Sequence, residues 1–319
     1  MITLSVNKFL GALTNLIAYT QVANTTEKGV VGEFVESFQD VNVENGDGKV
    51  IRSADLQSVS DLSGTSSILT QSKPTVKEQY VSVENYKVIH MTINKYLMRN
   101  AFVNETQLAD FVGYLLSIMR TSKVAYLSEE LIKELEAYTP TQASQTVTIH
   151  LFDPTNVNDP AQLRALRTYN ANEIEKTAIE LINKMGFPTD KYNDDKLKEI
   201  IDFSSMKFIV RGSTNADLLV NSLATLLNSN KITEAQKWGE TYVVPDEQFT
   251  SLAGDVIAWL MHKKKIQFGY FYEVATEFFD ASTLDSQNFL HFAYYLDTIN
   301  SYPAVVIKYD LSLTPAPLT

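Results

Sequence analysis

The sequence contains no cysteine, which excludes a disulfide framework, a thiolate metal site and a cysteine nucleophile. Histidine is scarce as well: there are four, and none has a second histidine or a carboxylate at ligand spacing on a helix. We therefore expect no bound metal, and the stability of the chain must come from packing or from association with other chains.

Basic residues are outnumbered, since 27 Lys and Arg face 38 Asp and Glu, for a formal net charge of −11. A dedicated nucleic-acid reader needs surplus cations to neutralise phosphates, so this class is excluded, whereas loose enclosure of DNA is not. The one basic cluster is Lys263, Lys264 and Lys265. It either faces packaged DNA or an acidic neighbour, or forms a solvated turn before a strand.

Long apolar runs are also missing. The longest, Leu108 to Met119, is interrupted by Asp110 and is too short to cross a bilayer, and the N-terminus does not read as a signal peptide. With 45% hydrophobic and 20% charged residues, the 319-residue chain is expected to be a soluble intracellular protein without membrane partners. Its length suits two domains, or one large domain with an insertion.

Motifs for chemistry are absent or incomplete. The stretch Arg211 to Asn215 lies where phosphate loops occur, but it has one glycine and no Gly-Lys-Ser/Thr ending. The stretch Asp40 to Gly48 resembles a calcium loop but has asparagine at the glycine position and Ile51 at the bidentate acidic position. The acidic pair at Asp194 and Asp195 is predicted to be solvated. We therefore expect neither an enzyme nor a cofactor.

The N-terminal third predicts an unusual organisation. Apolar residues over 3–20 share one helical face, and a second short helix is expected over 31–38. These are either two small core helices or an arm that packs on a neighbouring subunit. A strand from Lys49 to Leu56, a polar stretch and a long alternating strand from Val81 to Ile93 then predict a hairpin. This hairpin either folds on its own core or reaches over a neighbour.

The middle of the chain alternates helices and strands. A helix capped by Asn104 is expected to break over Thr121–Tyr126 and to resume at Ser128. The remaining predicted elements are a strand over 146–152, a helix start at Asp159-Pro160, a helix over 173–185 ended by Gly186, a strand over 206–210, a helix over 215–227 and a strand over 241–245.

The C-terminal run from Lys263 to Leu311 is rich in strand signals. Ile266, Phe268, Tyr270, Tyr272 and Val274 follow the two-residue period of a strand with one buried face. Two further strand segments, Phe289 to Tyr295 and Ala304 to Ile307, complete a set that needs partners from elsewhere in the chain.

The aromatic segments Gln267–Tyr272 and Phe289–Tyr295, with the terminal Pro303–Ile307, resemble the end of tailed-bacteriophage major capsid proteins. The likeness is to the Hong Kong 97-type shell fold, with a podovirus-like C-terminal sheet. It implies an α+β fold with an N-terminal arm, an extended β-hairpin loop, a peripheral domain with a spine helix, and an inserted axial domain. The implied ranges are 1–45 for the arm, 46–94 for the hairpin loop, 95–140 and 256–319 for the peripheral domain, and 141–255 for the axial domain.

The same resemblance implies a structural virion protein, a capsid subunit that assembles with itself into pentamers and hexamers around phage double-stranded DNA. A portal, a decoration protein and a scaffolding protein are the other implied partners. The chain starts directly on the predicted arm, so we expect separate scaffolding and no large proteolytic removal. Assembly in the host bacterial cytoplasm is also expected. The alternatives are an encapsulin-like compartment shell and a phage tail or host-surface binding protein. The predicted inter-subunit contacts are Leu4, Phe9, Phe34, Arg52, Lys73, Tyr80, Glu84 and Tyr86.

Overall fold

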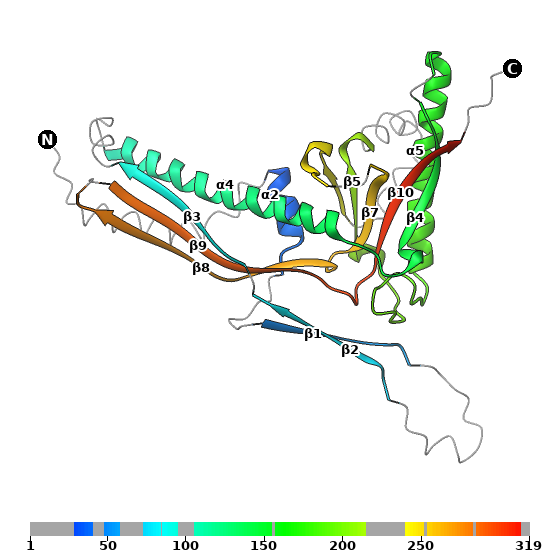
Figure 1. The fold of residues 1–319 in the computed structure, drawn as a ribbon, viewed down its shortest axis with the longest axis horizontal. Helices are drawn as coiled ribbons and strands as arrows, with labels where there is room; N and C mark the ends of the chain where they lie inside the picture. The colour runs from blue at the N-terminus through cyan, green and yellow to red at the C-terminus, as the bar shows by residue number, and fades with distance from the viewer. Residues whose placement is uncertain are drawn as a thin grey trace. The chain divides into compact units, whose positions relative to one another are not determined.

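The computed structural model describes residues 29–40, 48–57, 73–83, 85–94, 105–154, 157–214, 240–251, 254–282 and 285–313, with the side chains of 105–116 and 203 left aside. The chain divides into two compact units (Figure 1). Unit 1 consists of Met1–Lys49, Tyr80–Leu131 and Gln267–Asp297, and unit 2 consists of Val50–Gln79, Ile132–Ile266 and Thr298–Thr319. Several helices and strands contribute residues to both units.

Unit 1 contains a three-stranded sheet in the order β3 (Asn85–Asn94), β9 (Asp285–Thr298) and β8 (Ile266–Asp280). Strands β3 and β9 are antiparallel, and their pairing extends over the whole of β3. Successive side chains of β9 point to opposite faces of the sheet, and Leu290, Phe292 and Tyr294 are buried on one of these faces. Helix α4 (Glu105–Ala137) lies against this face through Tyr126, whose hydroxyl is 3.0 Å from that of Tyr294.

The opposite face of this sheet carries exposed apolar side chains. Tyr86 and Val88 on β3 are 65% and 52% exposed. On β8, Tyr272, Val274 and Phe278 are 45%, 48% and 64% exposed. The expectation that Tyr272 and Val274 belong to a buried face with Ile266 is therefore wrong, because burial changes phase along β8 and passes to the odd-numbered residues beyond Tyr270.

A short helix, α2 (Val30–Ser37), confirms the prediction of a helix before residue 38. It buries Phe34 and Val35, and the rings of Phe34 and Phe38 pack edge to face at 5.1 Å. The backbone after the helix pairs with the start of β8, because Phe268 donates to the carbonyl of Phe38 and accepts from the amide of Asp40. The predicted helix over 3–20 and most of the predicted turn over 40–48 lie outside the described residues.

The long strand predicted from Val81 to Ile93 is two strands. The first, β2 (Val76–Ser82), pairs with β1 (Gly48–Ala54), whereas β3 starts at Asn85 and pairs with β9. Val81 and Ile93 are both buried, at 1% and 8% exposure. The alternation keeps its phase across the break, and for this reason periodicity alone could not reveal the change of sheet.

Helix α4 is also continuous where the sequence predicts a break over Thr121–Tyr126. The hydroxyls of Thr121 and Ser122 donate to the carbonyls of Ser117 and Ile118, four residues earlier, which satisfies them inside the helix. Ser128, predicted as an N-cap, likewise donates to the carbonyl of Ala125. The polar residues therefore do not end the helix.

Unit 2 contains a five-stranded sheet in the order β4 (Thr146–Phe152), β10 (Ala304–Leu313), β7 (Val256–His262), β5 (Met206–Arg211) and β6 (Glu240–Val244). Strand β10 is parallel to β4 and antiparallel to β7, and β5 is antiparallel to β7 and parallel to β6. The predicted strands over 146–152, 206–210 and 241–245 are confirmed. The three C-terminal strand segments that the sequence groups together divide between the two sheets.

Helix α5 (Pro160–Met185) joins this sheet in one hydrophobic core. Its start is as predicted, because the carboxylate of Asp159 accepts from the amides of Ala161 and Gln162, and it ends at Gly186. The buried side of its second half packs with residues of β5, β7 and β10; the members from the helix are Ile174, Ala178, Leu181, Ile182 and Met185. The predicted helix over 215–227 lies outside the described residues.

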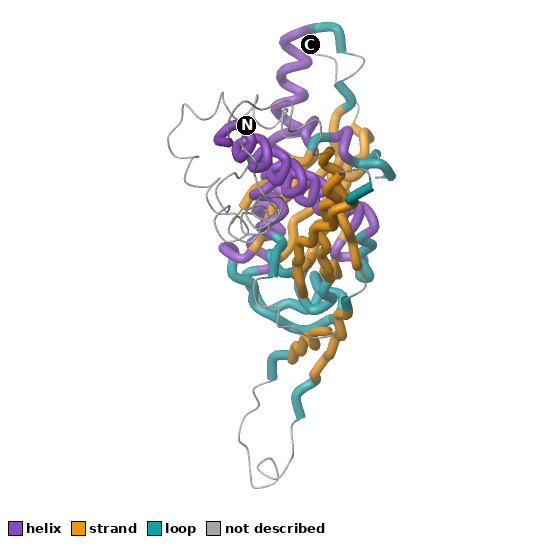
Figure 2. Tube along the Cα trace, turned by 90° about the vertical axis from the view of Figure 1, so that its left-hand side faces the viewer, coloured by secondary structure: helices purple, strands orange, loops and turns teal. Residues whose placement is uncertain are grey.

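Strands β1 and β2 form a two-stranded sheet of their own, and Figure 2 shows them side by side. Apart from Val81, every described residue of the two strands is exposed or half-buried. The hairpin thus has no buried face along most of its described length. Among the described residues, no helix is both long enough and apolar enough to span a membrane.

Candidate functional site

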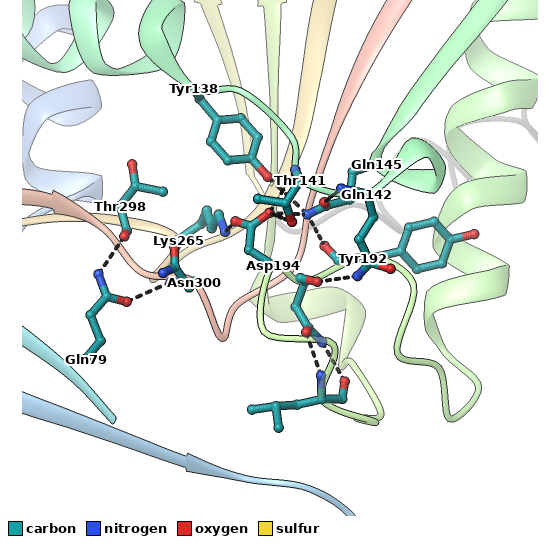
Figure 3. Close-up of polar contacts among 12 residues, drawn as sticks. Gln79, Tyr138, Thr141, Gln142, Gln145, Tyr192, Asp194, Lys265, Thr298 and Asn300 are labelled. Atoms are coloured by element: carbon teal, nitrogen blue, oxygen red, sulfur yellow. Dashed lines mark hydrogen bonds and ion pairs between the residues drawn. The ribbon is translucent and has the colours of Figure 1, made fainter. Parts of the chain in front are cut away.

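A buried ion pair lies where several loops of unit 2 meet (Figure 3). The Nζ atom of Lys265, between β7 and β8, is 2.6 Å from a carboxylate oxygen of Asp194. The two side chains are 0% and 6% exposed. Ions removed from water are stabilised only when they are paired and their remaining hydrogen-bonding positions are filled, so the surroundings of this pair decide what it contributes.

The second carboxylate oxygen of Asp194 accepts hydrogen bonds from neutral donors. It accepts from the hydroxyl of Thr141 at 2.9 Å and from the side-chain amide of Gln145 at 3.0 Å. The same amide also donates to the carbonyl of Tyr192 at 3.0 Å. The ammonium of Lys265 lies 5.1 Å from the centre of the Tyr138 ring. The pair therefore ties the end of α4, the start of β4 and the loop after α5 to the turn between β7 and β8.

The electrostatics of the pair follow from its burial. Burial by itself would raise the pKa of Asp194, but the hydrogen bond and charge of Lys265 outweigh it and hold that pKa below its usual value. Burial also lowers the pKa of Lys265, and the charge of Asp194 only partly offsets this effect. The contact with Asp194 thus stabilises the charged form of Lys265 against the cost of its burial.

A second acidic group in this region behaves differently. Burial raises the pKa of Glu199 to about 7, although a hydrogen bond from Asn193 and the charge of Lys265 both act to lower it. The side-chain amide of Asn193 also donates to the carbonyl of Leu197 and its oxygen accepts from the Leu197 amide, at 2.6 and 2.8 Å. These contacts fix the turn 193–197, in which Lys196 has a positive φ of 57°.

The hairpin is attached to this region through its side chains (Figure 3). The amide of Gln79, on β2, donates to the carbonyl of Thr298 at 2.9 Å and accepts from the amide of Asn300 at 2.8 Å. The carbonyl of Asn300 in turn accepts from the backbone amide of Asp194 at 2.9 Å. A continuous chain of hydrogen bonds therefore runs from the hairpin to the buried ion pair.

The arrangement contains no evident chemistry for catalysis. Its acidic and basic groups are engaged with one another, and in the part of the chain that the structure describes no group of three or more His, Asp or Glu residues could hold a metal ion. The region joins segments that are distant in sequence, and we call it the polar junction: Tyr138, Thr141, Gln145, Tyr192, Asn193, Asp194, Glu199, Lys265 and Asn300.

The predicted DNA-facing cluster is corrected at Lys265, which is buried against Asp194 and points away from solvent. Lys263 pairs with Glu240 at 2.7 Å, and Lys264 is exposed. The prediction that Asp194 is solvated is also wrong, because its side chain is buried against Lys265. A run of three lysines predicts a surface feature. The sequence around the run does not reveal the burial of Lys265, because its partner Asp194 lies 71 residues away.

The predicted inter-subunit residues fall into three groups. Phe34 is 6% exposed and packs inside unit 1, so its prediction as a surface contact is corrected. Arg52, Lys73 and Tyr80 are exposed on the hairpin or beside it, and Tyr86 is exposed on β3. The remaining three, Leu4, Phe9 and Glu84, lie outside the described residues. Sequence reasoning missed Gln79, Asp194 and Asn300, whose roles depend on partners that carry no local signal.

Comparison with known proteins gives one family match, to "Phi29-like phage major capsid protein", over residues 5–308. Among solved structures, the capsid of Staphylococcus phage Andhra has a TM-score of 0.61 at 11% identity and covers 85% of this chain and 82% of that chain. The capsid of the cyanophage P-SCSP1u has a TM-score of 0.52 at 12% identity and covers 85% of each chain. No curated protein matches the sequence.

The shared α+β architecture places the chain among proteins with the phage capsid fold. Because the family match covers nearly the whole sequence, the chain belongs to the Phi29-like phage major capsid protein family. Its role is structural rather than enzymatic, as a subunit of the virion capsid, and the predicted resemblance to tailed-phage major capsid proteins is confirmed.

Proposed function

We propose that this capsid subunit assembles into pentamers and hexamers of an icosahedral shell that encloses phage double-stranded DNA, and that it does so in the cytoplasm of the host bacterium. In this proposal, residues 1–45 act as an arm and 46–94 as an extended loop that both contact neighbouring copies. The segments 95–140 and 256–319 form the peripheral domain, and 141–255 gather around the five-fold and six-fold axes.

The observation that carries the proposal is the exposure of the hairpin. A two-stranded sheet is marginally stable by itself in water, and it gains stability when a face is covered. Val50, Val76 and Tyr80 are 49%, 50% and 62% exposed within the single chain. Contact with a neighbouring copy would bury these side chains, and the hairpin strands are thereby explained as an assembly element.

A second exposed surface supports the same proposal. The face of the three-stranded sheet in unit 1 that lies opposite α4 groups apolar side chains that a monomer would leave in water; they are Tyr86, Val88, Tyr272, Val274 and Phe278. Exposed apolar side chains that gather on one face of a sheet are typical of interaction sites. A shell subunit with several such surfaces sums many weak contacts into a stable assembly.

The remaining partners are a scaffolding protein, a portal at one vertex and a decoration protein. DNA is expected to be enclosed without specific recognition, since the net charge is −11 and Lys265 is unavailable to it. Lys263 and Lys264 remain the residues proposed to face the packaged DNA.

The test combines electron microscopy of purified particles with nucleic-acid quantification. Closed shells that contain DNA after packaging support the proposal, whereas shells that contain only protein cargo would favour the encapsulin-like alternative. A small oligomer without shells would favour the tail or host-surface binding protein and overturn the proposal.

Residue-level evidence comes from Tyr80→Ala, which removes an exposed hairpin side chain and should reduce the yield of shells. The matched control is Tyr169→Ala on α5, since Tyr169 is also exposed, at 41%. Equal shell yields from the two variants would argue against a hairpin contact through Tyr80.

A further inference from the structure

The hairpin's strands are largely exposed, yet three hydrogen bonds tie them to the loops of unit 2. Two involve Gln79, on β2, and the third involves Asp55, just beyond the end of β1. In all three, the hairpin contributes a side chain and the loop contributes a backbone group. These two side chains therefore contribute to the orientation of the hairpin within unit 2.

Gln79 binds the last residue of β9 and the segment that follows it with both ends of its amide. Its nitrogen donates to the carbonyl of Thr298 and its oxygen accepts from the amide of Asn300. A primary amide that meets one acceptor and one donor two residues apart reproduces the pairing of a neighbouring strand. Alanine at this position would remove both bonds at once.

Asp55 binds the loop after α5. One of its carboxylate oxygens accepts from the backbone amide of Lys198 at 2.8 Å. The backbone amide of Asp55 meanwhile donates to the carbonyl of Thr75 at 2.9 Å, which closes the β1–β2 pairing at this point. The backbone of Asp55 is thus hydrogen-bonded within the hairpin, and its side chain is hydrogen-bonded to the loop after α5.

Both receiving loops are held firmly by the polar junction. The carbonyl of Asn300 accepts from the amide of Asp194, and the amide of Ile299 donates to the carbonyl of Lys265 at 2.7 Å. On the other loop, Asn193 closes the turn that presents the amide of Lys198. The receiving loops are thus hydrogen-bonded to the polar junction, whereas the hairpin strands bury only Val81 among their described residues.

We propose that Gln79 and Asp55 form a latch that sets the direction in which the hairpin leaves unit 2, and that the hairpin pivots when the latch opens. This inference rests on the proposed function, since the direction matters only if the hairpin reaches a neighbour. One net hydrogen bond changes an equilibrium by about two- to tenfold. Three such bonds favour one orientation of the arm, and contacts with a neighbouring copy would compete with them.

The first experiment measures hydrogen exchange in the unassembled full chain. In Gln79→Ala, the peptide that contains Asn300 should lose protection about two- to tenfold, because its amide loses its acceptor. In Asp55→Ala, the peptide that contains Lys198 should change in the same way, whereas Asp55→Asn keeps an acceptor oxygen and should behave as the unmodified chain. The matched control is Gln57→Ala, since Gln57 is exposed and its side-chain amide donates to the carbonyl of Asp55, within the hairpin.

The second experiment measures the hairpin's orientation. Because the sequence has no cysteine, the pair Lys77→Cys and Arg167→Cys carries two spin labels at defined exposed positions on β2 and α5. The distance distribution should broaden when Gln79→Ala or Asp55→Ala is added and should stay narrow with Gln57→Ala. Unchanged distributions and unchanged exchange in both latch variants would overturn the proposal, provided that circular dichroism shows them folded.

The outcome is separable from the proposed function. If the distributions broaden but the Tyr80→Ala hairpin variant still assembles normally, the latch exists and a hairpin contact through Tyr80 is refuted. If Tyr80→Ala fails to assemble while both latch variants keep narrow distributions, the contact stands and the latch is refuted.

Discussion

Replacement of Lys265 by methionine tests the polar junction directly, because methionine keeps an unbranched chain while it removes the charge. The variant leaves the Asp194 carboxylate, 6% exposed, without its cation. Removal of one partner from a buried ion pair destabilises a protein by about 3–5 kcal/mol. The value should lie near the lower end, about 3 kcal/mol, since Thr141 and Gln145 still donate to the carboxylate.

The reciprocal change, Asp194→Asn, leaves an ammonium with 0% exposure without its hydrogen-bonded carboxylate, and a similar loss is expected. The double variant removes both charges of the pair, so it should be more stable than the sum of the two losses predicts. The coupling between the two residues should therefore reach about 2–3 kcal/mol.

The assay is urea unfolding of the unassembled chain, followed by tryptophan fluorescence; the two tryptophans of the sequence are Trp238 and Trp259, and Trp259 lies in β7. Lys264→Met is the control, because Lys264 is an exposed neighbour and its replacement should change the free energy of unfolding by less than about 0.5 kcal/mol. Losses below about 1 kcal/mol in both single variants, with additive behaviour in the double variant, would refute the reasoning.

Two other predictions concern Glu199 and Trp259. The pKa of Glu199 is raised to about 7, so the folded chain binds this proton more tightly than the unfolded chain; the associated stability is complete below about pH 4.5 and is lost as the pH rises through 7. Glu199→Gln should remove this dependence and gain about 1–2 kcal/mol at pH 8 but not at pH 4, and equal pH profiles of unfolding would contradict it. Trp259 is 1% exposed on the central strand β7 and stacks on Phe249 at 5.5 Å. Trp259→Ala should lower the free energy of unfolding, measured by thermal unfolding, by about 3–5 kcal/mol. A loss no larger than that of Trp259→Phe would show that neighbouring side chains fill the cavity.

The elements that sequence predicts correctly are those with strong local signals. Strands β4, β5 and β6 and the start of α5 at Asp159 depend on alternation and capping, which operate over a few residues. The predictions failed where one sequence pattern is compatible with two different structures. The alternation through β2 and β3 keeps one phase although the strands join different sheets, and Thr121 and Ser122 satisfy their hydroxyls inside α4 rather than ending it.

The candidate site was the least predictable part. The sequence predicts Lys265 as one of three surface lysines and Asp194 as half of a solvated acidic pair, because each residue stands in a run of charged residues. Gln79 is one polar residue among several on an exposed strand. Their burial and bonding arise from loops that meet only after both sheets have formed.

The sequence alone indicated the class of this protein through a resemblance: its aromatic C-terminal segments are similar to those of tailed-phage major capsid proteins, and the family match confirms this class. Only the tertiary structure decided which charges are buried, which sheet each strand joins and how the hairpin is attached. The physical reason is range. Composition and periodicity act through neighbours in sequence, whereas burial of Lys265 and the bonds of Gln79 depend on segments 71 and more than 200 residues away.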